Sequence, residues 1–284
     1  MKLVNSIAAP SWIAGFKISI YRCRNCNRSL ALGQASARKA GIKIREHWYC
    51  SSHCFTSAAE RELCDLLKTG HEQSASGSRV PLGLSLMSSG LLTTTQYKEA
   101  IDKQKEVGGD IGEMLVRTGS LSEKQVTAVR ATRWGCPVFT VPKHGVQTSI
   151  EVPATLLKAC SAIPLHYVAA TKLLLMGFVK DIEYGLLYAI EQMTGCKTQP
   201  CFVTPSDFQS QMQERELPPD PSSDEASKEV KIEGVQTPAE MARTLCSFVV
   251  DFEADEARIV KCKGYVWSRL KAGPKAVDLL FRAV

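Results

Sequence analysis

The spacing of apolar and polar positions changes several times along the chain. Between residues 79 and 135, apolar residues recur at helical spacing in short runs that glycine interrupts. Residues 136–212 alternate between helical patterns and short apolar runs such as "KLLLMGF" and "TQPCFVTP". Residues 236–284 open with a capped helix and continue as β-branched, partly alternating strands. The pattern predicts a helical lobe joined to an α/β lobe, and then a small α+β unit.

Polar stretches separate these regions. "GHEQSASGS" at 70–78 is small and polar, which predicts a linker. Residues 213–235 are rich in proline, serine and charge, so we predict that they form a disordered linker. The expected fold class is a multidomain α+β chain: a treble-clef-like zinc finger at 20–70, a tandem glycine-motif helical lobe at 79–135, an α/β lobe at 136–212, the linker at 213–235, and a small α+β domain at 236–284.

The helical region repeats itself. "PLGLSLMSSGLL" at 81–92 and "DIGEMLVRTGSL" at 110–121 each carry two glycines seven residues apart, and the two copies are offset by 29 residues. Each copy predicts a short helix and a turn that ends on a glycine with positive φ. A second helix then begins with a capping box, at Thr93-x-x-Gln96 and Ser122-x-x-Gln125. A single copy predicts only a helical hairpin, whereas the repeat raises the possibility of a two-part binding site.

The two copies resemble the tandem motif of the MshE N-terminal (MshEN) domain, the N-terminal domain family of GspE/PilB-like ATPases of type II secretion and type IV pilus assembly. Residues 151–208 resemble the α/β lobe of the same family. The resemblance implies a site for cyclic di-GMP in which aliphatic positions surround the bases and polar groups read the guanines and phosphates. The implied ligand-binding positions are Arg79, Leu82, Gly83, Leu86, Met87, Gly90, Leu91, Gln104, Asp110, Ile111, Gly112, Leu115, Val116, Gly119, Leu121 and Arg133.

The polar positions depart from the family motif. The motif arginine falls on Pro81 in the first copy and on Asp110 in the second, and Gln104 has Arg133 as its counterpart. Arginine reads guanine and phosphate through paired hydrogen bonds, so this change alters the expected recognition chemistry. Arginines able to substitute stand at Arg79, Arg117, Arg130 and Arg133. Two interpretations stay open: a nucleotide site with altered recognition, or a pair of hairpins whose apolar residues form only a core.

The head of the chain carries two close cysteine pairs. "CRNC" supplies Cys23 and Cys26, and "YCSSHC" supplies Cys50 and Cys54. Two such pairs predict a closed, structural tetrahedral Zn²⁺ site, and the strand and helix around the second pair resemble a treble-clef finger. Four buried thiols with accidental spacing are the alternative. His47 and His53 are nearby substitutes as ligands.

Composition and missing motifs limit the classes of function that the chain could perform. Among 284 residues, 44% are hydrophobic and 23% are charged, and the net charge is +6, a mild excess that does not demand an anionic partner. The 11 irregularly spaced cysteines indicate reduced thiols and a cytoplasmic protein, and no apolar run reaches membrane-spanning length. The sequence contains no G-x-x-x-x-G-K-[ST] motif and no Ser/His/Asp or Cys/His constellation, so we expect no enzymatic activity.

Three functional hypotheses follow. The first is a non-enzymatic cytoplasmic regulator that senses cyclic di-GMP through its MshEN-like region. The second is a nucleotide-independent adaptor that docks onto a secretion or pilus ATPase or onto another regulatory protein. The third, a zinc-finger nucleic-acid binder, rests only on the basic residues of the head, which on a small module more commonly serve solubility; a nucleic-acid partner is therefore not expected.

Overall fold

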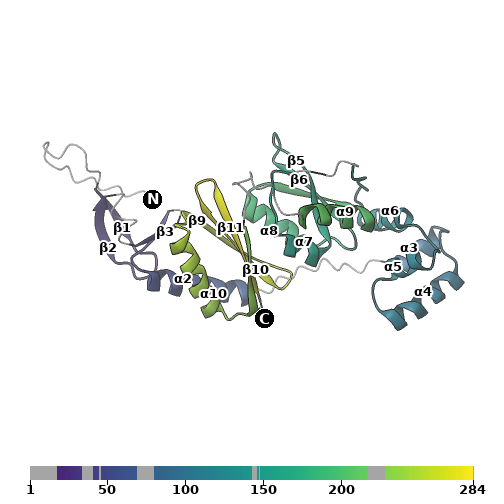
Figure 1. Ribbon diagram of the computed structural model, residues 1–284, viewed down its shortest axis with the longest axis horizontal. Helices are drawn as coiled ribbons and strands as arrows, with labels where there is room; N and C mark the ends of the chain where they lie inside the picture. The colour runs from purple at the N-terminus through teal and green to yellow at the C-terminus, as the bar shows by residue number, and fades with distance from the viewer. Residues whose placement is uncertain are drawn as a thin grey trace.

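The structure is a computed structural model that describes residues 18–33, 41–44, 46–68, 80–142, 146, 148–216 and 228–283. The predicted mixed α+β class is confirmed. In Figure 1 the cysteine-rich head lies at one end and the helical lobe at the other, with two sheets between them. The predicted linker at 70–78 lies outside the described residues. Within those residues, no helix combines the length and apolar character needed to cross a membrane.

The helical lobe consists of two hairpins that fold in the same way. Both predicted capping boxes are present, with Thr93 and Ser122 accepting the backbone N–H three residues ahead. Leu86 and Leu115, which the repeat places at equivalent positions, are both fully buried in the core of the lobe. The four helices are α3 (Leu82–Ser88), α4 (Thr94–Val107), α5 (Ile111–Arg117) and α6 (Glu123–Trp134).

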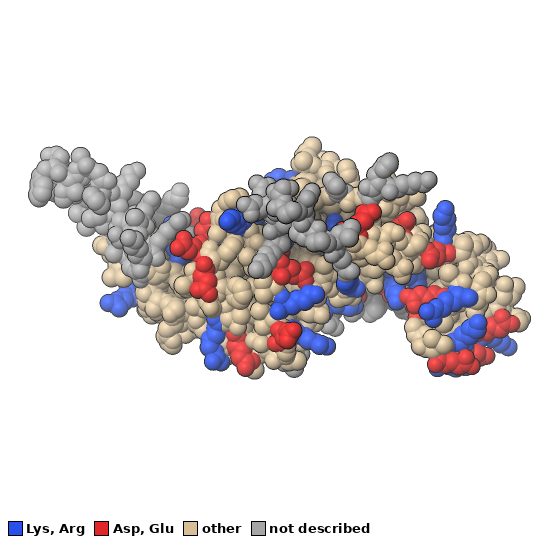
Figure 2. Space-filling model, in the orientation of Figure 1, with Lys and Arg blue, Asp and Glu red and all other residues tan. Residues whose placement is uncertain are grey.

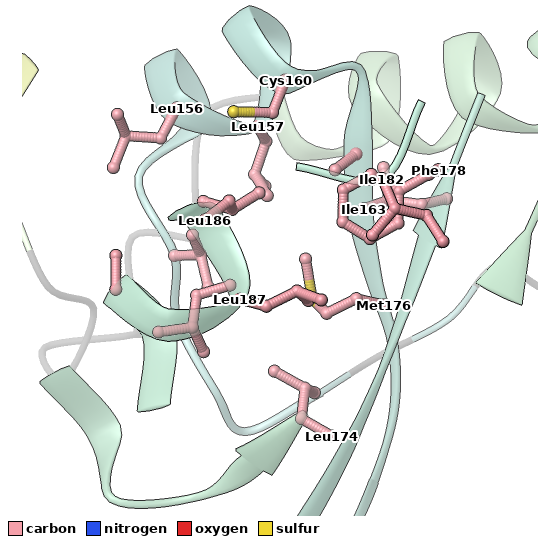
Figure 3. Packing of buried hydrophobic residues seen from close by; sticks show 14 of the residues in the cluster. Leu156, Leu157, Cys160, Ile163, Leu174, Met176, Phe178, Ile182, Leu186 and Leu187 are labelled. Carbon is pink, nitrogen blue, oxygen red and sulfur yellow. The ribbon is translucent and has the colours of Figure 1, made fainter. Parts of the chain in front are cut away.

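The α/β lobe is a small three-stranded sheet with helices packed against it. The strand order is β5-β6-β7; β5 pairs antiparallel with β6, and β6 pairs parallel with β7 through a helical crossover. Figure 3 shows leucines from two of its helices meeting Leu174, Met176 and Phe178 of the central strand. The elements are α7 (Ala154–Cys160), β5 (Ala162–Val168), β6 (Leu173–Phe178), α8 (Tyr184–Thr194), β7 (Lys197–Phe202) and α9 (Pro205–Glu216).

The C-terminal unit is a four-stranded sheet, with order β8-β11-β10-β9, and one helix. Its first strand corrects the linker prediction for 213–235, because α9 extends to residue 216 and a strand starts at 228. The apolar residues Val230 and Ile232 alternate with polar ones, and this strand joins the sheet in parallel with β11. The elements are β8 (Lys228–Val235), α10 (Pro238–Asp251), β9 (Glu256–Cys262), β10 (Tyr265–Ala272) and β11 (Lys275–Arg282).

The cysteine-rich head packs on this C-terminal unit. Its long helix α2 lies along α10, and their apolar residues share one core with the sheet. The two ends of the described chain therefore fold together, although the sequence suggested separate domains at 20–70 and 236–284. The head consists of β1 (Ile18–Arg22), β2 (Ser29–Gly33), β3 (Ile42–Ile44), β4 (His47–Tyr49) and α2 (Ser52–Lys68).

Candidate functional site

The predicted cysteine ligands come together in space. The sulfurs of Cys23, Cys26, Cys50 and Cys54 all lie within 4.8 Å of one another. The Cys50 sulfur is 3.6 Å from that of Cys26 and 3.5 Å from that of Cys54. A tetrahedral Zn²⁺ with Zn–S bonds of about 2.3 Å separates its sulfurs by about 3.8 Å, so the four thiols fit such an ion.

The surroundings of Cys23 favour a thiolate. Burial disfavours the charged form, but backbone N–H groups of Cys26, Cys50 and Asn25 outweigh burial and lower the pKa of Cys23 to about 6. The thiol of Cys50 donates toward Cys54 and also contacts Cys26, and these contacts raise its pKa to about 12. A thiolate is the form of cysteine that binds a metal ion, so the backbone groups around Cys23 suit it to be a ligand.

In the first hairpin, the motif glycine is covered by the protein itself. Gly83 is buried in the first turn of α3, and a Cβ built on it would overlap the ring of Tyr97 on α4. The glycine therefore allows the tyrosine ring to pack closely against the helix. Gly83, one of the implied ligand-binding positions, is therefore covered by this ring.

In the second hairpin, the equivalent position is covered by an arginine. A Cβ on Gly112 would lie 2.6 Å from Nη2 of Arg130 and 2.9 Å from Cγ1 of Val126. Arg130 is only 5% exposed; its Nη2 is paired with Asp110 and its Nη1 donates to the Val179 carbonyl at 2.6 Å. Asp110 also caps α5 by accepting the N–H of Gly112 at 3.0 Å. This network joins the helical lobe to the α/β lobe.

Two further polar candidates bind backbone carbonyls. Nε2 of Gln104 donates to the Gly109 carbonyl at 2.9 Å, and Nε of Arg133 donates to the Val80 carbonyl at 2.9 Å. Of the remaining arginines, Arg117 is exposed at the end of α5. Arg79 lies outside the described residues. Most of the polar groups expected to read a nucleotide are therefore engaged within the lobe.

The two turns that end on Gly90 and Gly119 have the same backbone conformation and the same hydrogen bonds. Gly90 and Gly119 both have φ of 71°, and no atom stands within 4 Å of a Cβ built on either one. Their N–H groups donate at 3.0 Å to the carbonyls of Met87 and Val116. Among the apolar candidates, Leu82, Leu86, Leu115 and Leu121 are core residues, whereas Met87, Ile111 and Val116 are half-buried and Leu91 is 37% exposed.

The sequence predicted no role for Tyr97 and Val126 in covering the two glycines, and it offered Arg130 only as an arginine able to read a nucleotide. Tyr97 and Val126 stand 29 residues apart, as the glycines do, so the repeat offset alone could have paired each with its glycine. Arg130 takes the place of Ile101 in the second copy. The sequence did contain a signal for the buried pair of Arg130 and Asp110. Arg130 stands at a position that is apolar in the first copy, and Asp110 supplies an opposite charge at the start of the same copy.

The role of Gly112 can be tested by a matched substitution. Gly112→Ala is expected to destabilise the chain by about 1–3 kcal/mol, because the new methyl must displace the Arg130 guanidinium and Val126. Gly185 occupies the same second position of α8, with nothing within 4 Å, so Gly185→Ala should stabilise by about 0.5–1 kcal/mol. Urea unfolding of both variants measures the difference, and equal effects would mean that Gly112 is not constrained by packing.

A curated relative supports the resemblance. Over 158 residues the chain is 29% identical to the Type IV pilus assembly ATPase PilB of Thermus thermophilus; the match covers 53% of this chain and 18% of that protein. The predicted resemblance to GspE/PilB-like N-terminal domains is confirmed. No protein-family model matches the chain.

Solved structures that match part of the chain include MshE with cdg, at 19% identity and a TM-score of 0.40, covering 48% of this chain and 99% of that one. A structure of the N-terminal domain of XpsE is 18% identical with a TM-score of 0.34, and the match covers 46% of this chain and 91% of that one.

Proposed function

We propose that this chain is a non-enzymatic cytoplasmic regulator whose residues 79–212 dock onto a GspE/PilB-like ATPase without requiring a nucleotide. The observation that carries this proposal is the buried network of Arg130, Asp110 and the Val179 carbonyl. A domain that resembles part of a pilus ATPase, with its polar groups engaged internally, is better suited to protein contact than to nucleotide recognition.

The internal network opposes ligand recognition on energetic grounds. If Arg130 turned toward a phosphate, the Asp110 carboxylate and the Val179 carbonyl would each lose a partner. Val179 is buried, so an unpaired carbonyl there costs about 1–3 kcal/mol, whereas Asp110 is 27% exposed and would lose less. A nucleotide would have to offset these losses before any net affinity appeared.

The helical lobe also offers an apolar surface for a protein partner. Around α3, the side chains of Val80, Leu84 and Leu91 are 58%, 48% and 37% exposed. Figure 2 displays blue and red side chains interspersed at this end of the molecule, without a patch of one sign on the face in view. A contiguous exposed apolar patch can mark a protein interface, and we propose that these three side chains belong to such a patch.

Complex formation with the GspE/PilB-like ATPase of the same cell is the test. We expect the purified proteins to form a complex in analytical ultracentrifugation with or without cyclic di-GMP, and Leu84→Asp to weaken it at least tenfold. Val250 on α10 is 52% exposed and distant in sequence, so Val250→Asp is the matched control that should bind normally. The proposal fails if no complex forms, or if the complex requires the nucleotide.

Cyclic di-GMP sensing is the second candidate, and the duplicated turns favour it. Gly90 and Gly119 repeat the same geometry beside the half-buried Met87 and Val116, as the family motif requires. Under this alternative, calorimetric titration gives micromolar or tighter binding that Arg133→Ala weakens. If the titration releases or absorbs no heat with cyclic di-GMP in excess, this alternative is wrong.

The cysteine cluster is proposed to hold one structural Zn²⁺ in this regulator. The four ligands would be Cys23, Cys26, Cys50 and Cys54, whose sulfurs already have the spacing of a tetrahedral site. A site with four protein ligands has no open position for substrate, so the ion would stabilise the fold and perform no catalysis. Nucleic acid is not a proposed partner.

A further inference from the structure

The C-terminal sheet is shared by two different cores. On β10, Val266 and Leu270 pack with α2 and α10, whereas Trp267 points to the opposite face and joins the core of the α/β lobe. β11 alternates in the same way, since Leu279 belongs to the first core and Leu280 to the second. Successive residues of a strand point to opposite faces, so each strand contacts both cores.

One face of the sheet depends on the helix that carries a cysteine ligand. Cys54 lies in the first turn of α2, and Phe55, Ala59 and Leu63 bury that helix against α10 and the sheet. Cys246 of α10 donates its thiol to the Ser52 carbonyl at 3.8 Å. A metal bound to Cys54 would therefore hold the end of the helix that covers this face.

The opposite face binds the helices of the α/β lobe through their ends. Glu229 of β8 accepts the N–H of Ala154 at 2.8 Å at the start of α7. Nη1 of Arg258 on β9 donates to the carbonyls of Gln192 and Met193 near the end of α8, at 2.7 and 3.2 Å. These contacts satisfy groups that helix ends leave open, so the sheet contributes to the order of both helices.

We propose that metal occupancy at the cysteine cluster is coupled, through α2 and the C-terminal sheet, to the stability of the α/β lobe. Loss of the metal would free Cys54, loosen α2 and uncover one face of the sheet. The strands that loosen are the same strands that hold α7 and α8. The coupling is reciprocal, so loosening the lobe would weaken metal binding. The proposal rests on the proposed zinc site and does not depend on docking to an ATPase.

Hydrogen exchange with mass spectrometry on the full chain tests the coupling. We compare zinc-loaded protein with protein stripped by EDTA. Amides of α2, α10 and β10 are expected to exchange at least tenfold faster after stripping, as are those of α7 and α8. The hairpin helix α4 packs in the separate core of the helical lobe and should keep its rates. Faster exchange confined to β1–β4 and α2 would overturn the proposal.

A second variant separates the helix contact from the metal itself. Leu63 is 1% exposed and belongs to the core that α2 shares with the sheet, two helical turns from Cys54. Leu63→Ala should retain one zinc per chain yet raise exchange in α8 at least tenfold. Val250→Ala, an exposed change on α10, should leave exchange in α8 unchanged. Unaltered α8 exchange in the Leu63 variant would show that the sheet does not transmit the change.

Discussion

Cys54→Ser is expected to abolish stoichiometric zinc binding and to unfold the cysteine-rich head. The sulfur of Cys54 lies 3.5 Å from that of Cys50, at one corner of the proposed tetrahedron. The binding free energy of a structural Zn²⁺ is also folding free energy, about 10–16 kcal/mol in zinc-finger peptides, so losing one of four ligands should cost several kcal/mol. Metal analysis and thermal unfolding by circular dichroism give the two readouts.

Cys64 provides the matched control for this substitution. It lies on the same helix α2, is partly buried, and is not part of the four-cysteine cluster. Cys64→Ser should keep one zinc per chain and change stability by less than about 1 kcal/mol. If Cys54→Ser also retained its zinc, or if the two variants lost equal stability, the cluster would not be a metal site.

The features that sequence predicted correctly are those with local causes. The capping boxes at Thr93 and Ser122 and the positive φ of Gly90 and Gly119 depend on residues within one hairpin, and all are present. The cysteine cluster was also predictable, because each close pair supplies two ligands from one short segment.

The features that sequence did not predict depend on contacts between distant segments. Val230 and Ile232 lie in a polar region, and only pairing with β11, about fifty residues later, makes that region a strand. The alternating pattern did not locate the turn between β9 and β10, where Lys263 and Gly264 both have positive φ and form a hairpin. The sequence also could not predict that two cores share the sheet, because a pattern of apolar residues does not show which elements pack on each face.

The burial of Arg130 has the same origin. On a helical pattern, an arginine at the position of Ile101 suggests a solvent-exposed or ligand-reading group. Its actual partners are Asp110, in another helix's cap, and the carbonyl of Val179, 49 residues away. Shape in this lobe could thus be predicted from the repeat, whereas the assignment of its polar groups required the tertiary structure.

Asp278→Asn should be among the most destabilising single changes in the C-terminal sheet, by about 3–5 kcal/mol. Asp278 accepts Nε and Nη2 of Arg269, each at 2.7 Å, and the indole N–H of Trp267 at 2.7 Å. The side chains of Arg269 and Asp278 are only 7% and 3% exposed, so the amide would leave a buried guanidinium without its counter-charge. Arg269 also donates to the Glu151 carbonyl at 2.8 Å. The substitution should therefore also destabilise the segment before α7.

An exposed pair supplies the control for this charge removal. Lys105 and Asp102 lie 3.0 Å apart on α4, with side chains 72% and 69% exposed, so Asp102→Asn should change stability by less than about 1 kcal/mol. Urea unfolding compares the free energies of unfolding of the two variants. Replacing both members of the buried pair with apolar residues, as Arg269→Met with Asp278→Leu, should recover part of the loss, because no unpaired charge remains. If Asp278→Asn cost no more than Asp102→Asn, the sheet would not depend on this ion pair, and its hold on the α/β lobe would rest on apolar packing and on the hydrogen bonds of Glu229 and Arg258.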